Sequence, residues 1–443
     1  MAHNSPALPT PPSQFLPHLS NHQLTETRRL LQPFLSYESW LRTAFADGNV
    51  EVDKLANMVP IYDGEQNGFK IRTIDRVRAD GAKYIMPLPD HVREEDSTLA
   101  IAASFEEYTR NFHGFSHGIL QGIDWSNIVV VGSSALLPLL SRRRGVPDSS
   151  PEEYFQKIAS KSDIDIFLYG LESEDAAIIL VSQLESMVRM NQGSNHGEGL
   201  SRRSKNAITF LSPKQPYRHV QVVLRLYRSI SEILTGIDLD CSCVAFDGRQ
   251  VYSNPRGISA IATRTNMIDL SRRGPAYEYR LWKYRKYNFE VFWDSLDRSR
   301  INPILFNPFL TVFDRVQGLG RLLLYEKELQ EGISKEGKEG DDWEKQLLSR
   351  IDESGGSSSQ VRGDYDPYGI LSGEEVTAGT VYENLESHPD ESCQHGTIQE
   401  VIEGKSSGVG NHEYLIGRVR FNQHTSGRPQ ITETLEPLVQ GNW

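Results

Sequence analysis

The pattern of apolar and polar positions predicts a strand-rich centre between two helical regions. The run NIVVVG at residues 127–132 is continuously apolar and ends at a glycine, which is typical of a buried strand. Further apolar or alternating runs predict strands at residues 163–169, 206–211 and 219–227. A hairpin is expected over residues 237–254, with Asp247-Gly248 at its turn.

Apolar residues at helical spacing predict helices beside and between these strands. Residues 36–46 bring their aromatic residues to one face, and Ser36 can cap the start of that helix. Ser104 has a glutamate three positions later, the spacing of a capping box, so another helix is expected to begin there. Two central helices are expected at residues 173–190 and 229–236, and the second ends at a glycine.

These elements predict an α+β fold with five regions along the chain. The regions are a Pro-, Ser- and His-rich disordered arm at residues 1–24, a mostly helical lead-in with a small hairpin at 25–125, a strand-rich domain at 126–265, a helical region at 266–330, and an acidic, largely disordered tail at 331–443.

Charge is unevenly distributed along the chain, and this limits the classes of ligand. The whole chain has a formal net charge of −12, but the segment from Ser126 to Arg300 has 24 Lys and Arg against 19 Asp and Glu. A mildly basic centre between acidic flanks favours a small phosphate-bearing ligand over a long duplex, which needs a larger basic footprint.

The composition also predicts where the protein resides. No run of eighteen apolar residues is present and the first residues lack the pattern of a secretory signal, so we expect no membrane association and an intracellular protein, cytoplasmic or nuclear. Cys241, Cys243 and Cys393 are too few for a disulfide framework. Cys241 and Cys243 share one face of an expected strand, and buried thiols explain them better than a zinc site does.

Two carboxylates in the centre are the first candidates for chemistry. Asp163 and Asp165 alternate along the predicted strand, so both project from one face while the isoleucines point into the core. Two like charges this close repel each other, and a divalent cation would neutralise them. Paired carboxylates are what metal-assisted phosphoryl chemistry requires. Solvated acids at an exposed strand end are the alternative.

A glycine–serine turn is the second candidate. Gly132 allows close approach of a phosphate to the backbone, and the free N–H groups at the start of the following helix attract it. Ser133 and Ser134 each add a hydroxyl, although simple helix capping explains them about as well. The turn has neither the spacing of a P-loop nor that of a dinucleotide-binding fingerprint.

Taken together, VVVGSSALLPLL at residues 129–140 and SDIDIFL at 162–168 resemble the nucleotidyltransferase superfamily of DNA polymerase beta. The chain is also similar to uncharacterised fungal proteins that carry this domain. The resemblance covers roughly residues 126–265. It implies a small mixed sheet of nucleotidyltransferase type flanked by helices, here with helical additions at both ends. It also implies magnesium-dependent transfer of a nucleoside monophosphate from a nucleoside triphosphate.

The resemblance assigns roles residue by residue. Asp163 and Asp165 become Mg²⁺ ligands and catalytic residues, while Gly132, Ser133 and Ser134 bind the triphosphate substrate. Arg225, on the polar face of the strand at 219–227, is a further candidate for nucleotide binding. The resemblance does not indicate the acceptor, which leaves a protein, a small molecule and RNA as alternatives.

Two departures from the family's pattern bear on activity. The carboxylates come 30 residues after Ser133 instead of about a dozen, so an inserted loop or a longer helix pair is expected between them. The family's third acid would fall at Gln221, and a glutamine cannot act as a base. Asp238 or Asp240 could replace it if their strand lies adjacent; turn and cap chemistry is the simpler explanation of both.

Two other hypotheses stay open. The first is a catalytically degenerate nucleotidyltransferase fold that serves as an interaction or regulatory module, which Gln221 favours. The second is nucleic-acid binding by the aromatic and basic helix at residues 276–287. For that helix, packing of its aromatic residues with solvated cations is the simpler interpretation.

Overall fold

The structure is a computed structural model of the whole chain. It describes residues 5–22, 27–48, 52–63, 69–72, 81–143, 149–194, 199–274, 277–306, 318–335, 393–405, 415 and 417–422.

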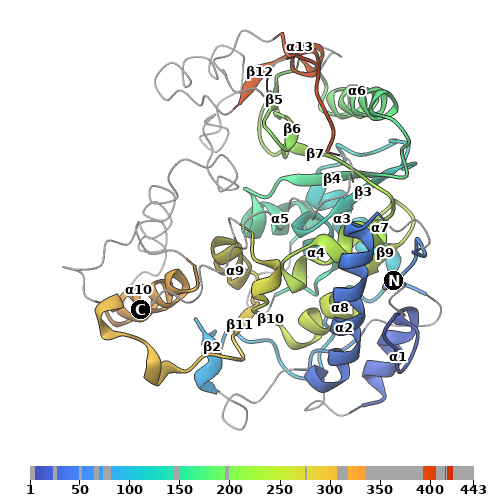
Figure 1. Cartoon of the computed structure of the whole chain (residues 1–443). Helices are drawn as coiled ribbons and strands as arrows, with labels where there is room; N and C mark the ends of the chain where they lie inside the picture. Colours follow the sequence, from blue (N-terminus) through green and yellow to red (C-terminus); the bar gives the residue numbers. More distant parts are fainter. Residues whose placement is uncertain are drawn as a thin grey trace.

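A large mixed sheet forms the centre of the described part of the chain (Figure 1). In spatial order its strands are β1 (Val59–Pro60), β9 (Val251–Ser253), β8 (Val244–Phe246), β3 (Ile128–Val131), β4 (Ile164–Tyr169), β7 (Val220–Tyr227), β6 (Ala207–Phe210), β5 (Ser201–Arg203) and β12 (Gln394–Gly396). A smaller sheet contains β10 (Thr265–Met267), β11 (Glu290–Phe292) and β2 (Tyr84–Ile85). The structure is therefore a mixture of α and β elements, as expected.

The centre of the large sheet combines antiparallel and parallel pairs. Strand β3 runs antiparallel to both β4 and β8, whereas β4 runs parallel to β7. The β3–β4 register places Val130 opposite Ile166, and the β4–β7 register places Asp165 opposite Gln221. Asp165 and Gln221, which are 56 positions apart in the sequence, therefore lie side by side on neighbouring strands.

Helices surround the large sheet and extend the molecule beyond it (Figure 1). The α-helices are α1 (Phe15–Ser20), α2 (Thr27–Ala46), α3 (Phe105–Ser116), α4 (Ser133–Leu139), α5 (Pro151–Ala159), α6 (Glu174–Asn191), α7 (Ile230–Gly236), α8 (Pro255–Thr263), α9 (Tyr277–Arg285), α10 (Gly320–Lys335) and α13 (Ile398–Glu403). Short 3-10 helices are η1 (Pro12–Gln14), η3 (Gly81–Lys83), η4 (Asp240–Ser242), η5 (Leu270–Arg272), η6 (Arg298–Arg300) and η7 (Pro303–Phe306).

The two faces of the central strands pack differently. Even-numbered residues of β4, such as Ile164 and Ile166, belong to the main core together with residues of α3, α4, α5 and α6. The opposite face contributes Phe167 to a smaller cluster with Ile233 and Leu234 of α7. Asp163 and Asp165 are odd-numbered and so lie on the side of this smaller cluster, where Asp165 remains partly exposed.

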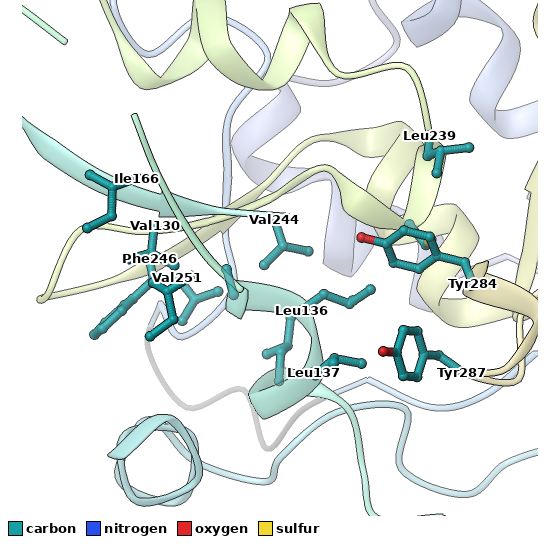
Figure 2. Packing of buried hydrophobic residues seen from close by; sticks show 14 of the residues in the cluster. Val130, Leu136, Leu137, Ile166, Leu239, Val244, Phe246, Val251, Tyr284 and Tyr287 are labelled. Atoms are coloured by element: carbon teal, nitrogen blue, oxygen red, sulfur yellow. The ribbon is translucent and has the colours of Figure 1, made fainter. Parts of the chain in front are cut away.

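Helix α4 packs between the sheet and the end of α9 (Figure 2). Leu136 and Leu137 of α4 lie between the strand residues Val130 and Val244 and two tyrosines, Tyr284 and Tyr287. The tyrosines come from α9 and from the turn after it. The glycine–serine turn and α9 therefore contribute to one core.

Most of the predicted central elements are confirmed. The predicted strands appear as β3, β4, β6 and β7, and the predicted hairpin turn at Asp247-Gly248 joins β8 to β9. Helices α6 and α7 have nearly the predicted bounds, with Ser173 and Ser229 as their caps. Ser104 caps α3 by accepting a hydrogen bond from the backbone N–H of Glu107 at 3.1 Å.

Other predictions are wrong in their details. Helix α2 begins at Thr27, and Ser36 lies inside it, where its hydroxyl donates to the carbonyl of Gln32. The predicted arm is not disordered as far as it is described, because residues 12–20 are helical and bury three apolar side chains, Phe15, Leu16 and Leu19. These apolar residues have helical spacing, which the prediction overlooked.

The C-terminal region also contributes elements to the core. Helix α10 and the pair β12 and α13 lie in or beside the range predicted as an acidic, largely disordered tail. Strand β12 extends the large sheet by pairing with β5, and α13 packs against α6. The stretch EYLIGRVRF at residues 413–421 also suggests a strand, but its described residues, Leu415 and 417–421, form none; Val419 and Phe421 are buried.

Within the described residues, none of the helices has the length and apolar character needed to cross a membrane.

Candidate functional site

The site begins at the turn between β3 and α4. Gly132 has a φ of +78°, a left-handed conformation that favours glycine, and a side chain added there would meet no atom within 4 Å. Ala135 and Leu136 donate the first helical hydrogen bonds to the Gly132 carbonyl, so the amides of Ser133 and Ser134 precede the hydrogen-bonded ladder. The turn therefore combines open space with backbone donors.

The two serines of this turn have different environments. Ser134 is fully buried, and its hydroxyl donates to the carbonyl of Val131 at 3.1 Å while accepting from the backbone N–H of Asp165 at 3.4 Å. It therefore ties the turn to the carboxylate strand. Ser133 retains slight exposure, at 8%, and is the serine better placed to meet a ligand.

The two halves of the predicted site meet despite the long gap in sequence. Antiparallel pairing of β3 with β4 puts the end of one strand beside the start of the other, and Asp163 and Asp165 lie at that start. The intervening chain forms α4 and then α5, whose start is fixed by a capping box between Ser150 and Glu153. Part of the expected insertion is thus the helix α5.

Helix α9 brings positive charge to the carboxylates. Partial burial raises the pKa of Asp165 to about 6, while Lys283 and Arg280 oppose that rise by favouring its charged form. Both cations lie on α9, three residues apart, and so share one face of the helix. The apolar side chains of α9, Tyr277, Leu281 and Tyr284, are buried, as the packing interpretation predicted.

The position expected for a third acid is occupied by glutamine. Gln221 is the register partner of Asp165 in the parallel pair, so it lies where a third carboxylate would neighbour the first two. Its amide donates to the hydroxyl of Thr209 on β6 at 3.4 Å. The strand alignment inferred from sequence is therefore correct at this residue.

Asp238 and Asp240 are engaged in ion pairs. Asp240 is buried, and its carboxylate accepts from Arg256 at 2.9 Å and from the backbone N–H of Met267 at 2.7 Å. Burial raises its pKa, and Arg256 opposes that rise. Asp238 is also buried and accepts a hydrogen bond from Arg280. Asp238 therefore orients Arg280, one of the two cations that act on Asp165. Asp240 instead holds the buried Arg256 in the core.

The segment containing these two acids is not the predicted strand. Residues 237–243 form a loop and η4, and the first hairpin strand, β8, begins at Val244. Cys241 and Cys243 are buried free thiols, as expected, but they flank Ser242 in or beside η4 instead of sharing one face of a strand.

Arg225 lies away from the turn. It is four positions beyond Gln221 on β7, which corresponds to about 13 Å of strand. Its guanidinium pairs with Glu232 at 3.3 Å and packs over the ring of Tyr227. The structure does not bring it together with the other site residues.

The donor set fits a metal ion that shares its ligands with a substrate. Among the described residues, no group of three or more His, Cys, Asp and Glu side chains could hold a metal. Mg²⁺ commonly binds through one or two carboxylates plus substrate phosphates, and the hard oxygens of Asp163 and Asp165 suit it. A site made of protein side chains alone is not supported.

Comparisons with known proteins match only part of the chain. Residues 104–264 match the model of the Gabija anti-defense 2 family, and this range spans α3 through α8, including the turn and both carboxylates. An uncharacterised protein, R883 of Acanthamoeba polyphaga mimivirus, is 30% identical over 217 residues, 46% of this chain and 44% of that protein. The chain thus spans less than half of the curated relative. No solved structure matches.

Proposed function

We propose that the chain carries a nucleotidyltransferase-type sheet and transfers a nucleoside monophosphate from a magnesium-bound nucleoside triphosphate to an acceptor. One observation carries the proposal: the Gly132 turn and the Asp163/Asp165 strand meet at one edge of the sheet, linked through Ser134 and the backbone of Asp165. The combination of β3 antiparallel to β4 and β4 parallel to β7 supports the sheet type.

Each group has a defined task in this proposal. Asp163 and Asp165 would hold Mg²⁺, which would supply charge neutralisation at the transferring phosphorus. The amides of Ser133 and Ser134 and the hydroxyl of Ser133 hold phosphate oxygens at the start of α4. Lys283 and Arg280 balance the remaining negative charge of the phosphates from the side of α9.

The comparisons bear on the acceptor. The matched family is described by the words anti-defense, and its match includes the whole proposed site. From that description we infer that the acceptor is a component of a defence system, whether protein, small molecule or RNA. The three buried free cysteines support an intracellular site of action, cytoplasmic or nuclear.

The alternative function is a binding or regulatory module without turnover. Gln221 supports it, because the residue beside Asp165 can neither act as a base nor bind a hard cation well. In that case, the carboxylates and the turn still bind the magnesium nucleotide, but no transfer follows.

Calorimetry and a pyrophosphate assay test both functions. We expect wild-type protein to bind ATP with Mg²⁺ and the Asp163→Ala/Asp165→Ala variant to lose that binding. The matched control is Asp175→Ala/Asp294→Ala, which removes two acids whose side chains are 71% and 78% exposed. Equal binding by wild type and the site variant, or none by either, would contradict the site.

Gln221→Asp separates the two functions. If the fold is active, pyrophosphate release by wild type is abolished by Asp165→Asn and increases with the added acid, on the order of tenfold or more. Binding without release in wild type, with release appearing only in Gln221→Asp, would support the module without turnover.

A further inference from the structure

A small cavity lies beside the proposed site, between the ends of α4 and α9. Its volume is about 10 Å³, the space of one water-sized sphere. Leu137 and Leu140 provide its apolar wall from α4, and Ile158 of α5 contributes to the same wall. The polar part of the lining comes from Tyr154 of α5 and from four other segments of the chain, so several elements meet at the cavity.

Arg264 is the central polar residue of this cavity. It follows α8, is only 4% exposed, and donates through one terminal nitrogen to the carbonyl of Ala100 at 2.9 Å and weakly to Ser141. Within the described residues, its Nε and its other terminal nitrogen have no hydrogen-bond partner. Burying a guanidinium whose N–H donors have no acceptor costs more folding free energy than burying a neutral polar group. A bound hydrogen-bond acceptor would therefore stabilise this site.

Other donors surround the same space. The hydroxyl of Tyr154 accepts from the backbone N–H of Arg143 at 3.1 Å, which leaves its own proton to donate. Tyr287 contributes a second hydroxyl, and the guanidinium of Arg143 contributes a second cation. The cavity is thus surrounded mainly by hydrogen-bond donors. A ligand that only accepts hydrogen bonds satisfies these donors better than a ligand that must also donate.

The charge of the lining points in the same direction. Arg143 and Arg264 provide two positive charges, while Glu94 provides one negative charge. Burial is the main cause that lowers the pKa of Arg264 to about 10; Glu94 opposes this shift and Arg143 adds to it. The charged groups of the lining therefore sum to one net positive charge, which a single bound anion would neutralise.

We propose that this cavity binds a small inorganic anion of halide size. The anion accepts from the free nitrogens of Arg264 and from the tyrosine hydroxyls, and it balances the excess positive charge. The small volume suits one monoatomic ion. The site is distinct from the proposed nucleotide site, because its lining includes neither the glycine–serine turn nor the two aspartates.

Occupancy links elements that carry the proposed site. Tyr287 also shares a hydrogen bond of 3.2 Å with Ser162, the residue before Asp163, and Arg143 donates to the carbonyl of Lys286 just after α9. An anion between these groups therefore holds the end of α9 against α4 and α5. The inference does not depend on the proposed function, since it requires no nucleotide.

Bromide provides the decisive test, because it replaces chloride and scatters anomalously. Crystals of the full chain grown in sodium bromide should show an anomalous peak in the cavity beside the Nε of Arg264. A cavity that contains water alone, without such a peak, overturns the proposal.

Thermal unfolding gives a second readout in solution. At constant ionic strength, replacing sodium gluconate by sodium chloride should raise the Tm to a plateau, because a ligand that binds only the folded state stabilises it. Arg264→Met should lose this chloride-specific rise, whereas the exposed control Arg249→Met should retain it. If Arg264→Met does not fold, Arg143→Met takes its place. A chloride response that is equal in cavity and control variants contradicts the assignment.

Discussion

Asp165 sits in a partly dehydrated position between the start of β4 and the cationic face of α9. Burial disfavours its charged form, and the two α9 cations compensate only in part, so its pKa rises from 3.8 to about 6. Such a carboxylate destabilises the folded chain when it is ionised. A cation that binds beside it would stabilise its ionised form. Local instability of this kind is typical of groups retained for binding.

Asp165→Asn should therefore stabilise the free protein at neutral pH. The folded state binds the proton more tightly than the unfolded state between about pH 4 and pH 6, so stability falls as the pH rises through that window. The variant removes this loss, and we expect a gain of about 1–2 kcal/mol in the free energy of unfolding at pH 7.5. Little gain is expected at pH 4.

Urea unfolding at the two pH values measures this difference. The exposed substitution Asp294→Asn serves as the control, because it alters charge without altering burial. A stability change in Asp165→Asn that is the same at pH 7.5 and pH 4 would show that ionisation is not its cause.

At the scale of elements, a buried network of charges fixes α2 against α8 and η4. Glu38 of α2 accepts from Arg256 at 3.1 Å and pairs with Arg272 at 3.3 Å, while Asp240 holds the other side of Arg256. All four side chains are at least 95% buried. The network joins four segments, α2, η4, α8 and η5, of which the first and last are more than 200 residues apart in sequence.

Glu38→Gln should be strongly destabilising. It leaves Arg256 with Asp240 alone and Arg272 with the partly exposed Asp269 alone, and breaking a buried pair in this way costs about 3 kcal/mol. Denaturant unfolding measures the loss, and the exposed acid Glu106 in the first turn of α3 provides the matched control, Glu106→Gln. Equal stability of the two variants would mean that the network contributes nothing.

The predicted elements were most accurate where local signals agree. Ser104, Ser173 and Ser229 each cap the expected helix, because a hydroxyl before a helix binds its free amides whatever the tertiary context. The same reasoning failed at Ser36, which has the residue type of a cap but lies within α2. The helix begins nine residues before Ser36, at Thr27, because burial of Leu31 and Phe34 stabilises these earlier turns as well.

At the scale of the whole molecule, the core extends from the first to the last described segments. Phe15 and Phe421 belong to the same core cluster as the central strands. Arg203 of β5 donates to the carbonyls of Val401 and Gly417 at 3.1 and 2.9 Å, which fastens the C-terminal segment to the edge of the sheet. The C-terminal strand and helix therefore belong to the fold.

Ile398→Ala in α13 should reduce the stability of the whole chain. Ile398 is 3% exposed and lies in the main core cluster, and removing such a side chain costs about 2–4 kcal/mol. The neighbouring exposed residue gives the control Gln399→Ala. If α13 unfolded independently, spectroscopic probes of the central sheet would not register the change.

Periodicity and local chemistry, which act over a few residues, were enough to predict the central strands. The pairing of the glycine–serine turn with the two aspartates, and the alignment of Gln221 with Asp165, were predicted from the resemblance to a known family, and the strand register agrees with both. Three features became known only from the three-dimensional structure: Lys283 and Arg280 act on the charge of Asp165, Asp238 and Asp240 pair with arginines, and Arg264 lines a cavity. Those contacts join residues 16 to more than 100 positions apart, and no local pattern specifies which distant charges will meet.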